Sequence, residues 1–247
     1  MSRPGASRRI GAGLDALAAR YDLSELARDR LERLLNALAR DPLAPTAVRD
    51  PLRALHDHLA DALVALELEP VRTARSLADL GSGAGVPGLP LAIAREELEV
   101  SLVEAAGRKC AFLRGVVEDL GLARVTVVHA RAEELAGQAP STFDLVTVRA
   151  VASLAVVAEY AAPLLKTGGS LVAWRGDRDP EAELEGQRAA LELGLTVSAP
   201  LAVSPYSGAQ HRHLHLMSKV GETPARFPRR PGMATKRPLG RAKTRSA

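Results

Sequence analysis

The chain has one cysteine, few aromatic residues and no long apolar run. Cys110 alone excludes an internal disulfide and suits a reducing compartment, and it falls in an apolar helical stretch where core packing is its expected role. No segment reaches the apolar length that a membrane span needs, and the basic N-terminus leads into an amphipathic segment, unlike a signal peptide. We therefore expect a cytoplasmic protein that contacts no membrane.

Aromatic residues make up only 3% of the sequence, although 47% of it is hydrophobic, so alanine, leucine and valine must form the core. The length of 247 residues fits one large domain with additions. Charge is unevenly distributed: residues 221–247 hold six Arg and two Lys against one Glu, or 8 − 1 = +7, so the first 220 residues carry 4 − 7 = −3. A basic end of this kind indicates a nucleic-acid partner, although a solvated tail has the same composition.

Residues 77–94, LADLGSGAGVPGLPLAIA, are typical of a buried strand, a glycine turn and the opening of a helix. Gly81, Gly83 and Gly85 permit positive φ and close approach of a ligand, and the helix N-terminus offers unpaired N–H groups. Val86 stands where a dinucleotide fingerprint needs its third glycine, and no Gly-Lys-Ser/Thr follows. The spacing therefore excludes NAD and P-loop motifs, and leaves open a turn used only for tight packing.

The spacing Asp-x-Gly-x-Gly-x-Gly, which begins at Asp79, resembles the first motif of class I S-adenosylmethionine methyltransferases. The next predicted strand, 98–103, ends in Glu104, which lies 104 − 81 = 23 residues after Gly81. A carboxylate at this strand end can accept hydrogen bonds from both ribose hydroxyls of a nucleoside. We therefore predict that Glu104 is a ribose ligand and not a solvated loop residue.

Strands and helices continue to alternate after Glu104, which predicts an α/β fold with a parallel sheet covered on both faces. Ligands in such sheets bind beyond the carboxyl ends of the strands. Ala132 and Glu133 follow the third strand and are candidates for the adenine edge, and Arg149 ends the fourth strand. The predicted elements are helices over 108–120, 153–166 and 181–193, strands over 125–129, 143–148 and 170–174, and a closing hairpin from 195–203 and 213–217.

Leucine stripes at helical spacing indicate that the first 70 residues form helices. Asp22 with Glu25 resembles a capping box, and Asp50 before Pro51 predicts a further helix start. We predict three parts, namely a helical cap (1–70), a Rossmann-like methyltransferase core (71–220) and a basic RNA-binding segment (221–247).

Several segments, taken in order, resemble the bacterial small-subunit ribosomal RNA methyltransferase G family, also called glucose-inhibited division protein B. The match covers most of the chain and includes His58 and Asp61, one helical turn apart, which could face a site or form a surface hydrogen bond. The matching segments are LADLGSGAGVPGLPLAIA, VEAAGRKCAFLR, ARAEEL, FDLVTVRAVASL, LLKTGGSLVAWRG and TPARFPRRPGMATKRPLG.

The resemblance implies a class I S-adenosylmethionine-dependent methyltransferase with a Rossmann-like, mostly parallel seven-stranded sheet. It also implies methyl transfer from S-adenosylmethionine to N7 of a specific guanine in 16S ribosomal RNA near the decoding centre. The chain departs from the family at Ala62, where Ser is common, and at Arg175, where Lys is common. Val86 replaces a common Phe but keeps an apolar contact and a backbone amide, so we expect cofactor binding to survive.

The chemistry of guanine N7 fits the residues after the fourth strand. N7 carries a lone pair and no proton, so in-line attack on a sulfonium methyl needs no general base, and positioning should dominate. Arg149, Ala150 and Val151 stand where exocyclic-amine methyltransferases carry a Pro-Pro-aromatic motif, and Cys110 is poorly placed as a cytosine-C5 nucleophile. Arg149 is therefore the predicted catalytic residue, in contact with the methionine end of the cofactor or with guanine O6; a strand-end salt bridge is the alternative.

The basic end supplies the predicted RNA contacts. Phosphates are assigned to four cations, and a base can stack on Phe227. The four cations are Arg229, Arg230, Lys236 and Arg237.

Histidines at 211, 213 and 215 lack familiar metal-ligand spacing, so we expect no metal site. We expect a monomer that acts on 16S RNA or on the small-subunit particle. Two alternatives remain: a methyltransferase for a protein or a small molecule, and a noncatalytic ribosome-assembly factor that retains the fold.

Overall fold

A computed structural model describes residues 4–241; residues 1–3 of the predicted cap and 242–247 of the predicted basic segment lie outside the described residues. Residues 4–73 form a series of helices joined by a turn at 21–24 and a loop at 41–50. No helix within the described range is both long and apolar enough to cross a membrane. The N-terminal elements are α1 (Pro4–Arg20), α2 (Glu25–Arg40), α3 (Pro51–Ala54), the π-helical η1 (Leu55–Ala60), α4 (Asp61–Leu63), the 3-10 turn η2 (Val64–Glu67) and α5 (Glu69–Thr73).

One of the two predicted helix starts is correct. Asp50 caps α3, with its carboxylate accepting from the Arg53 N–H at 2.8 Å and Pro51 in the first turn. The predicted capping box is wrong, because Ser24 caps α2.

The hydroxyl of Ser24 accepts from the Ala27 N–H, and its backbone is extended, as an N-cap requires. Asp22 instead has φ 50°, in the left-handed region, and belongs to the turn between α1 and α2.

The strands form one sheet, whose main path has the order β3-β2-β1-β4-β5-β8-β6, with β7 paired to β8 outside this path. β1 to β5 run parallel, and β8 is antiparallel to β5 and β6. The predicted class, a mostly parallel α/β sheet, is confirmed, but the sheet has eight strands and not the predicted seven. The strands are β1 (Ser76–Leu80), β2 (Glu99–Glu104), β3 (Val125–His129), β4 (Phe143–Arg149), β5 (Leu165–Arg175), β6 (Leu195–Val197), β7 (Leu201–Ala202) and β8 (His213–Lys219).

Three predicted elements differ in extent, and one of them is the strand predicted over 170–174, which spans Leu165–Arg175. The strand predicted over 195–203 divides into β6 and β7, because they pair with opposite ends of β8. The helix predicted over 153–166 ends at Ala161, and the chain enters β5 at Leu165 to pair with Phe143. The helices of the core are α6 (Gly88–Ala94), α7 (Gly107–Leu120), α8 (Ala132–Gln138), α9 (Leu154–Ala161), α10 (Pro180–Glu192) and α11 (Met233–Lys236).

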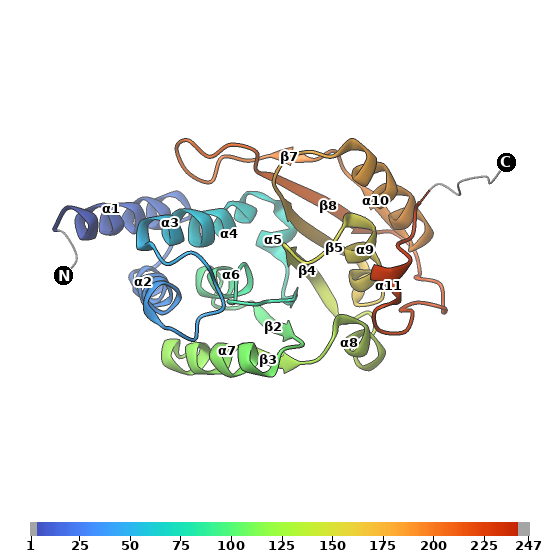
Figure 1. Ribbon diagram of the computed structural model, residues 1–247, viewed down its shortest axis with the longest axis horizontal. Helices are drawn as coiled ribbons and strands as arrows, with labels where there is room; N and C mark the ends of the chain where they lie inside the picture. Colours follow the sequence, from blue (N-terminus) through green and yellow to red (C-terminus); the bar gives the residue numbers. More distant parts are fainter. Residues whose placement is uncertain (1–3, 242–247) are drawn as a thin grey trace.

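Helices cover both faces of the sheet (Figure 1). Successive side chains of a strand point to opposite faces, so Leu77 joins the core under α2, α6 and α7, whereas Ala78 joins the core under α8, α9 and α10. The N-terminal helices share the first of these cores, since α2 packs against both α6 and α7. The carboxyl ends of the parallel strands β1 to β4 consequently meet at one edge, which is left to the loops.

Candidate active site

The glycine turn lies at the carboxyl end of β1. Gly81, Gly83 and Gly85 all have positive φ, at 68°, 57° and 85°. A Cβ on Gly85 would lie 2.2 Å from Cδ1 of Leu89, and one on Gly81 would lie 2.8 Å from Cγ2 of Val151. The turn therefore needs glycine both for its backbone conformation and for its neighbours.

Asp79 ties the turn to the strands below it. Its buried carboxylate accepts from the Thr147 hydroxyl on β4 at 2.8 Å and from the Gly88 N–H at the start of α6 at 3.3 Å. Burial raises the pKa of Asp79 to about 6. The carboxylate fixes where α6 begins, a structural role that the motif spacing alone did not reveal.

Glu104 lies at the end of β2, next to the turn. Its Oε2 accepts from the Gly83 N–H at 3.1 Å and its Oε1 from the Ala106 N–H at 2.8 Å, and Lys109 Nζ is 3.8 Å away. Each carboxylate oxygen has a second lone pair, so the group can still accept from ribose hydroxyls. A buried carboxylate beside a glycine cradle thus fits a nucleoside, and the residues present suit S-adenosylmethionine.

The remaining predicted cofactor residues occupy different environments. Val86 is buried in the core that contains Leu89. Ala132 begins α8, after β3. Glu133 is buried, and its Oε1 accepts from the Gly232 N–H of the C-terminal segment at 2.9 Å, so one of its oxygens already serves that segment. The sequence gives no sign of this long-range bond.

Arg149 extends from the end of β4 toward the helical turn that contains residues 57–61. Its Nη1 donates to the Asp57 carbonyl at 2.6 Å and to Asp61 Oδ2 at 3.2 Å, and its Nη2 donates to His58 Nδ1 at 3.1 Å. His58 and Asp61 are both buried, so the surface hydrogen bond considered for this pair is wrong. The helical turn and β4 are joined through one guanidinium.

The protonation of His58 follows from its neighbours. Because Arg149 can only donate, Nδ1 is an acceptor, and the proton on Nε2 is donated to the Thr46 hydroxyl at 2.9 Å. Burial and the adjacent guanidinium lower the pKa of His58 to about 4. The imidazole is neutral near pH 7, and both of its nitrogens are engaged.

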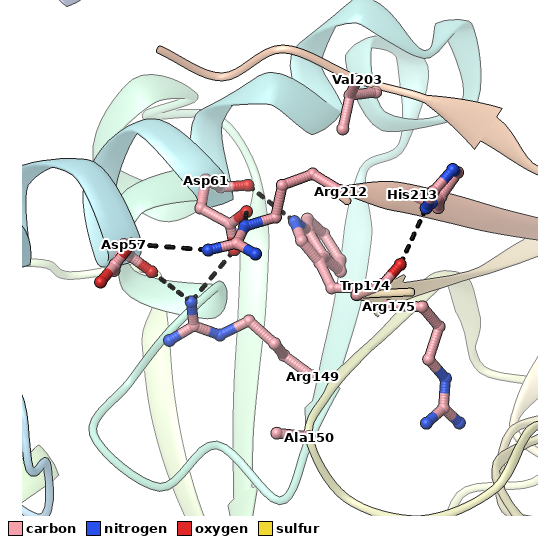
Figure 2. Close-up of a pocket in the computed structure, with 10 residues that line it drawn as sticks. Asp57, Asp61, Arg149, Ala150, Trp174, Arg175, Val203, Arg212 and His213 are labelled. Carbon is pink, nitrogen blue, oxygen red and sulfur yellow. Dashed lines mark hydrogen bonds and ion pairs between the residues drawn. The ribbon is translucent and has the colours of Figure 1, made fainter. Parts of the chain in front are cut away.

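A cavity of about 350 Å³ opens beside Arg149, at the ends of β4 and β5 and the start of β8 (Figure 2). Most of these residues could not be predicted from the sequence to share a site, because they come from distant parts of the chain. Its wall is formed by Asp57, Asp61, Arg149, Ala150, Trp174, Arg175, Gly176, Val203, Arg212 and His213.

The segment 149–151 separates this cavity from the glycine turn and contacts both. Arg149 and Ala150 line the cavity, and the Val151 side chain lies against Gly81. Ala150 has φ 55°, a left-handed conformation that is rare for alanine. The turn and the cavity are thus neighbouring compartments at the same edge of the sheet, as ligand binding at strand ends requires.

The predicted RNA-binding residues of the C-terminal segment differ in their exposure to solvent. Arg230, Lys236 and Arg237 are exposed. Phe227 is only 8% exposed and packs in the core under α9 and α10, so the expectation that its ring stacks on a base is corrected. Arg229 forms a two-point ion pair with the buried Glu159 of α9, at 2.7 and 2.5 Å.

The three histidines near β8 have separate partners. His211 pairs with Asp177 at 2.6 Å, His213 Nδ1 contacts the Gly176 carbonyl at 2.8 Å, and His215 is buried. Residues 4–241 contain no group of three or more His, Cys, Asp or Glu side chains placed to hold a metal ion.

Solved structures with the same architecture include the mitomycin 7-O-methyltransferase MmcR, with a TM-score of 0.55 and 17% identity, covering 85% of this chain and 73% of that one. An O-methyltransferase family protein from Burkholderia thailandensis has a TM-score of 0.52 and 15% identity, covering 86% and 72%. These similarities show the fold, which is that of class I S-adenosylmethionine-dependent methyltransferases.

Relatives in sequence are far closer. A Ribosomal RNA small subunit methyltransferase G from Rubrobacter xylanophilus is 45% identical over 197 residues, which cover 77% of this chain and 75% of that protein. A protein of the same name from Chloroflexus aggregans is 43% identical over 222 residues, covering 88% and 92%. The model of the GidB family, described as rRNA small subunit methyltransferase G, matches residues 30–213, and the chain belongs to this family.

Proposed function

We propose that this chain transfers a methyl group from S-adenosylmethionine to N7 of a specific guanine in 16S ribosomal RNA near the decoding centre. The observation that carries the proposal is the pairing of a glycine turn beside the buried Glu104 carboxylate with a cavity that contains charged side chains, on the other side of segment 149–151. The names of the relatives support an RNA of the small ribosomal subunit as the acceptor.

The turn and the neighbouring strand ends would hold the cofactor, whose sulfonium supplies the methyl group when bound. The backbone at Gly81, Gly83 and Gly85 would permit close approach, and Glu104, which already accepts from the Gly83 N–H, would accept from the ribose hydroxyls. The residues assigned to the rest of the cofactor are Val86, Ala132, Glu133 and Arg149.

The chain's contribution to the reaction is to orient the acceptor and exclude water. The N7 lone pair of guanine forms the new N–C bond, and the C–S bond breaks with its electrons moving to sulfur. No proton leaves guanine in this step, so no general base is needed. This agrees with His58, whose two nitrogens are already occupied.

Arg149 acts in this proposal at the junction of the two compartments. It lines the cavity, and its guanidinium binds Asp61 in the cavity wall and the neighbouring buried His58. A charge-assisted network of this kind holds side chains in one arrangement, which favours a positioned acceptor base. The exposed cations Arg230, Lys236 and Arg237 would meet RNA phosphates.

The test is a transfer assay with labelled S-adenosylmethionine and three acceptors: 16S RNA, small-subunit particles, and pools of peptides or metabolites. We expect label in RNA or in particles, and N7-methylguanine at one position, which is absent from the RNA of cells without the gene. Transfer only to peptides or metabolites would overturn the RNA assignment. A calorimetric titration without S-adenosylmethionine binding would instead favour an assembly factor.

A further inference from the structure

The wall of the cavity contains a buried hydrogen-bond acceptor with no partner. Asp61 is 5% exposed; its Oδ2 accepts from Arg149, whereas its Oδ1 accepts no hydrogen bond. Arg212 Nε lies 3.4 Å from Oδ1 and forms an ion pair with it, but it does not donate a hydrogen bond to that oxygen. Buried carboxylate oxygens are normally satisfied, so this one calls for a donor that the chain does not supply.

The neighbouring carboxylate differs in this respect. Asp57 also lines the cavity, but its Oδ1 accepts from the Tyr206 hydroxyl at 3.1 Å and its Oδ2 from Arg53 at 3.5 Å. Three buried side-chain atoms within residues 4–241 lack a hydrogen-bond partner, namely the Tyr21 hydroxyl, Asp61 Oδ1 and Arg175 Nε. Asp61 and Arg175 both line this cavity. The missing partners are therefore concentrated at one place.

The missing hydrogen-bond donor matches the Watson–Crick edge of guanine. Guanine carries two adjacent donors, N1–H and the N2 amine, on its Watson–Crick edge, whereas adenine has no donor at either of these positions. Enzymes that modify an extruded base commonly read that edge by hydrogen bonds. N7 lies on the opposite side of the guanine ring, so a base held by N1–H or N2–H keeps N7 open to the methyl donor.

We propose that Asp61 is the residue that selects guanine, with its Oδ1 accepting from the N1–H and N2–H edge of the acceptor base seated in this cavity. Arg149 is then a positioning residue, because its bonds to Asp61 Oδ2 and His58 Nδ1 aim the carboxylate. Apolar wall residues Trp174 and Val203 give the ring of the base a surface to lie against. The inference rests on the proposed function.

The experiment compares acceptors that differ only in the two donors. Full-length 16S RNA is joined by splinted ligation around a synthetic segment whose target nucleotide is guanosine, inosine (which lacks the N2 amine) or 1-methylguanosine (which lacks N1–H). Transfer rates are measured for the wild type, for Asp61→Asn and for the matched control Asp57→Asn. The rate ratio of guanosine to each analogue within one protein is the readout, so a general loss of activity does not affect it.

We expect the wild type to prefer guanosine over at least one analogue by roughly 10- to 100-fold. The preference should fall to near 1 in Asp61→Asn, which exchanges an acceptor for a donor, and should persist in Asp57→Asn. Equal rates of the wild type on all three acceptors would overturn the assignment even if Asp61→Asn failed to fold, as would an unchanged preference in that variant. No transfer by the wild type to the guanosine RNA would instead overturn the proposed function.

Discussion

The Arg149 side chain connects the sheet to the N-terminal helices. The guanidinium spans from a strand end to three groups on residues 57, 58 and 61, and all three of these groups are acceptors. Such contacts use the fixed fork of the guanidinium, which Lys cannot reproduce. The residue that looks catalytic from its place in the sequence thus also holds the wall of the cavity together.

His58 gives the stability of the protein a specific pH dependence. Its pKa is about 4 when folded, because of burial and Arg149, against an ordinary value of 6.5. The unfolded chain takes up the proton first as the pH falls, so the contribution of His58 is complete above pH 6.5 and is lost as the pH falls toward 4.

We therefore expect the difference in unfolding free energy between the wild type and His58→Asn to shrink by about 3 kcal/mol between pH 6.5 and pH 4. Urea unfolding at several pH values measures it. Comparing the two proteins cancels the contribution of Asp79, which titrates in the same range. A difference that stays constant over this range would contradict the assignment of a neutral His58.

At the scale of elements, the C-terminal segment is fastened to the helices that cover one face of the sheet. Arg229 pairs with Glu159 on α9, the Gly232 N–H donates to Glu133 on α8, and Arg226 pairs with Glu192 on α10. Three different helices therefore hold a segment whose composition alone is compatible with a solvated tail.

Adjacent arginines in this segment should differ sharply in their effect on folding. Arg229→Ala leaves the carboxylate of Glu159, 1% exposed, without its partner, and we expect a loss of about 3 kcal/mol of unfolding free energy. Arg230→Ala removes an exposed cation and should change it by less than about 0.5 kcal/mol.

Chemical denaturation of both variants, followed by circular dichroism, measures this contrast. Arg229→Lys keeps the charge but not the two-point geometry and should fall between the two. Equal effects of the two alanine substitutions would show that the pair with Glu159 carries no stability.

At the scale of the whole molecule, the sheet can be predicted from the sequence and the cavity cannot. Each strand from β1 to β5 is a short apolar run bounded by turn residues, a local signal, and strand ends in a parallel sheet share one edge. The cavity brings Asp57 beside Arg149, 92 positions away, and Asp57 also accepts from Tyr206, 149 positions away; no local pattern encodes such contacts. Helix starts are only partly predictable from the sequence. Asp22 and Ser24 are both residue types that cap helices, and the packing of the helices decides which of them does so.

The charge distribution predicts how binding to RNA responds to salt. Each phosphate contact contributes about 0.7 to 0.9 to the slope of log affinity against log salt, so replacing Arg230, Lys236 and Arg237 by Ala should reduce the slope by about 2 to 3. Affinity for S-adenosylmethionine should not change, because these side chains are exposed on the C-terminal segment. Fluorescence anisotropy with labelled RNA over a salt series gives the slope, and calorimetry gives the cofactor affinity; an unchanged slope would move the RNA contacts elsewhere.

The scarcity of aromatic residues has a practical consequence for this cavity. Trp174 is the only tryptophan in the chain, its indole Nε1 donates to the Asp61 carbonyl at 2.7 Å, and its ring forms part of the wall. When the protein is excited at a wavelength where tyrosine hardly absorbs, all of its fluorescence therefore comes from this one side chain. A built-in optical probe therefore sits where the acceptor base is proposed to bind, and its intensity can follow occupancy in real time without any added label.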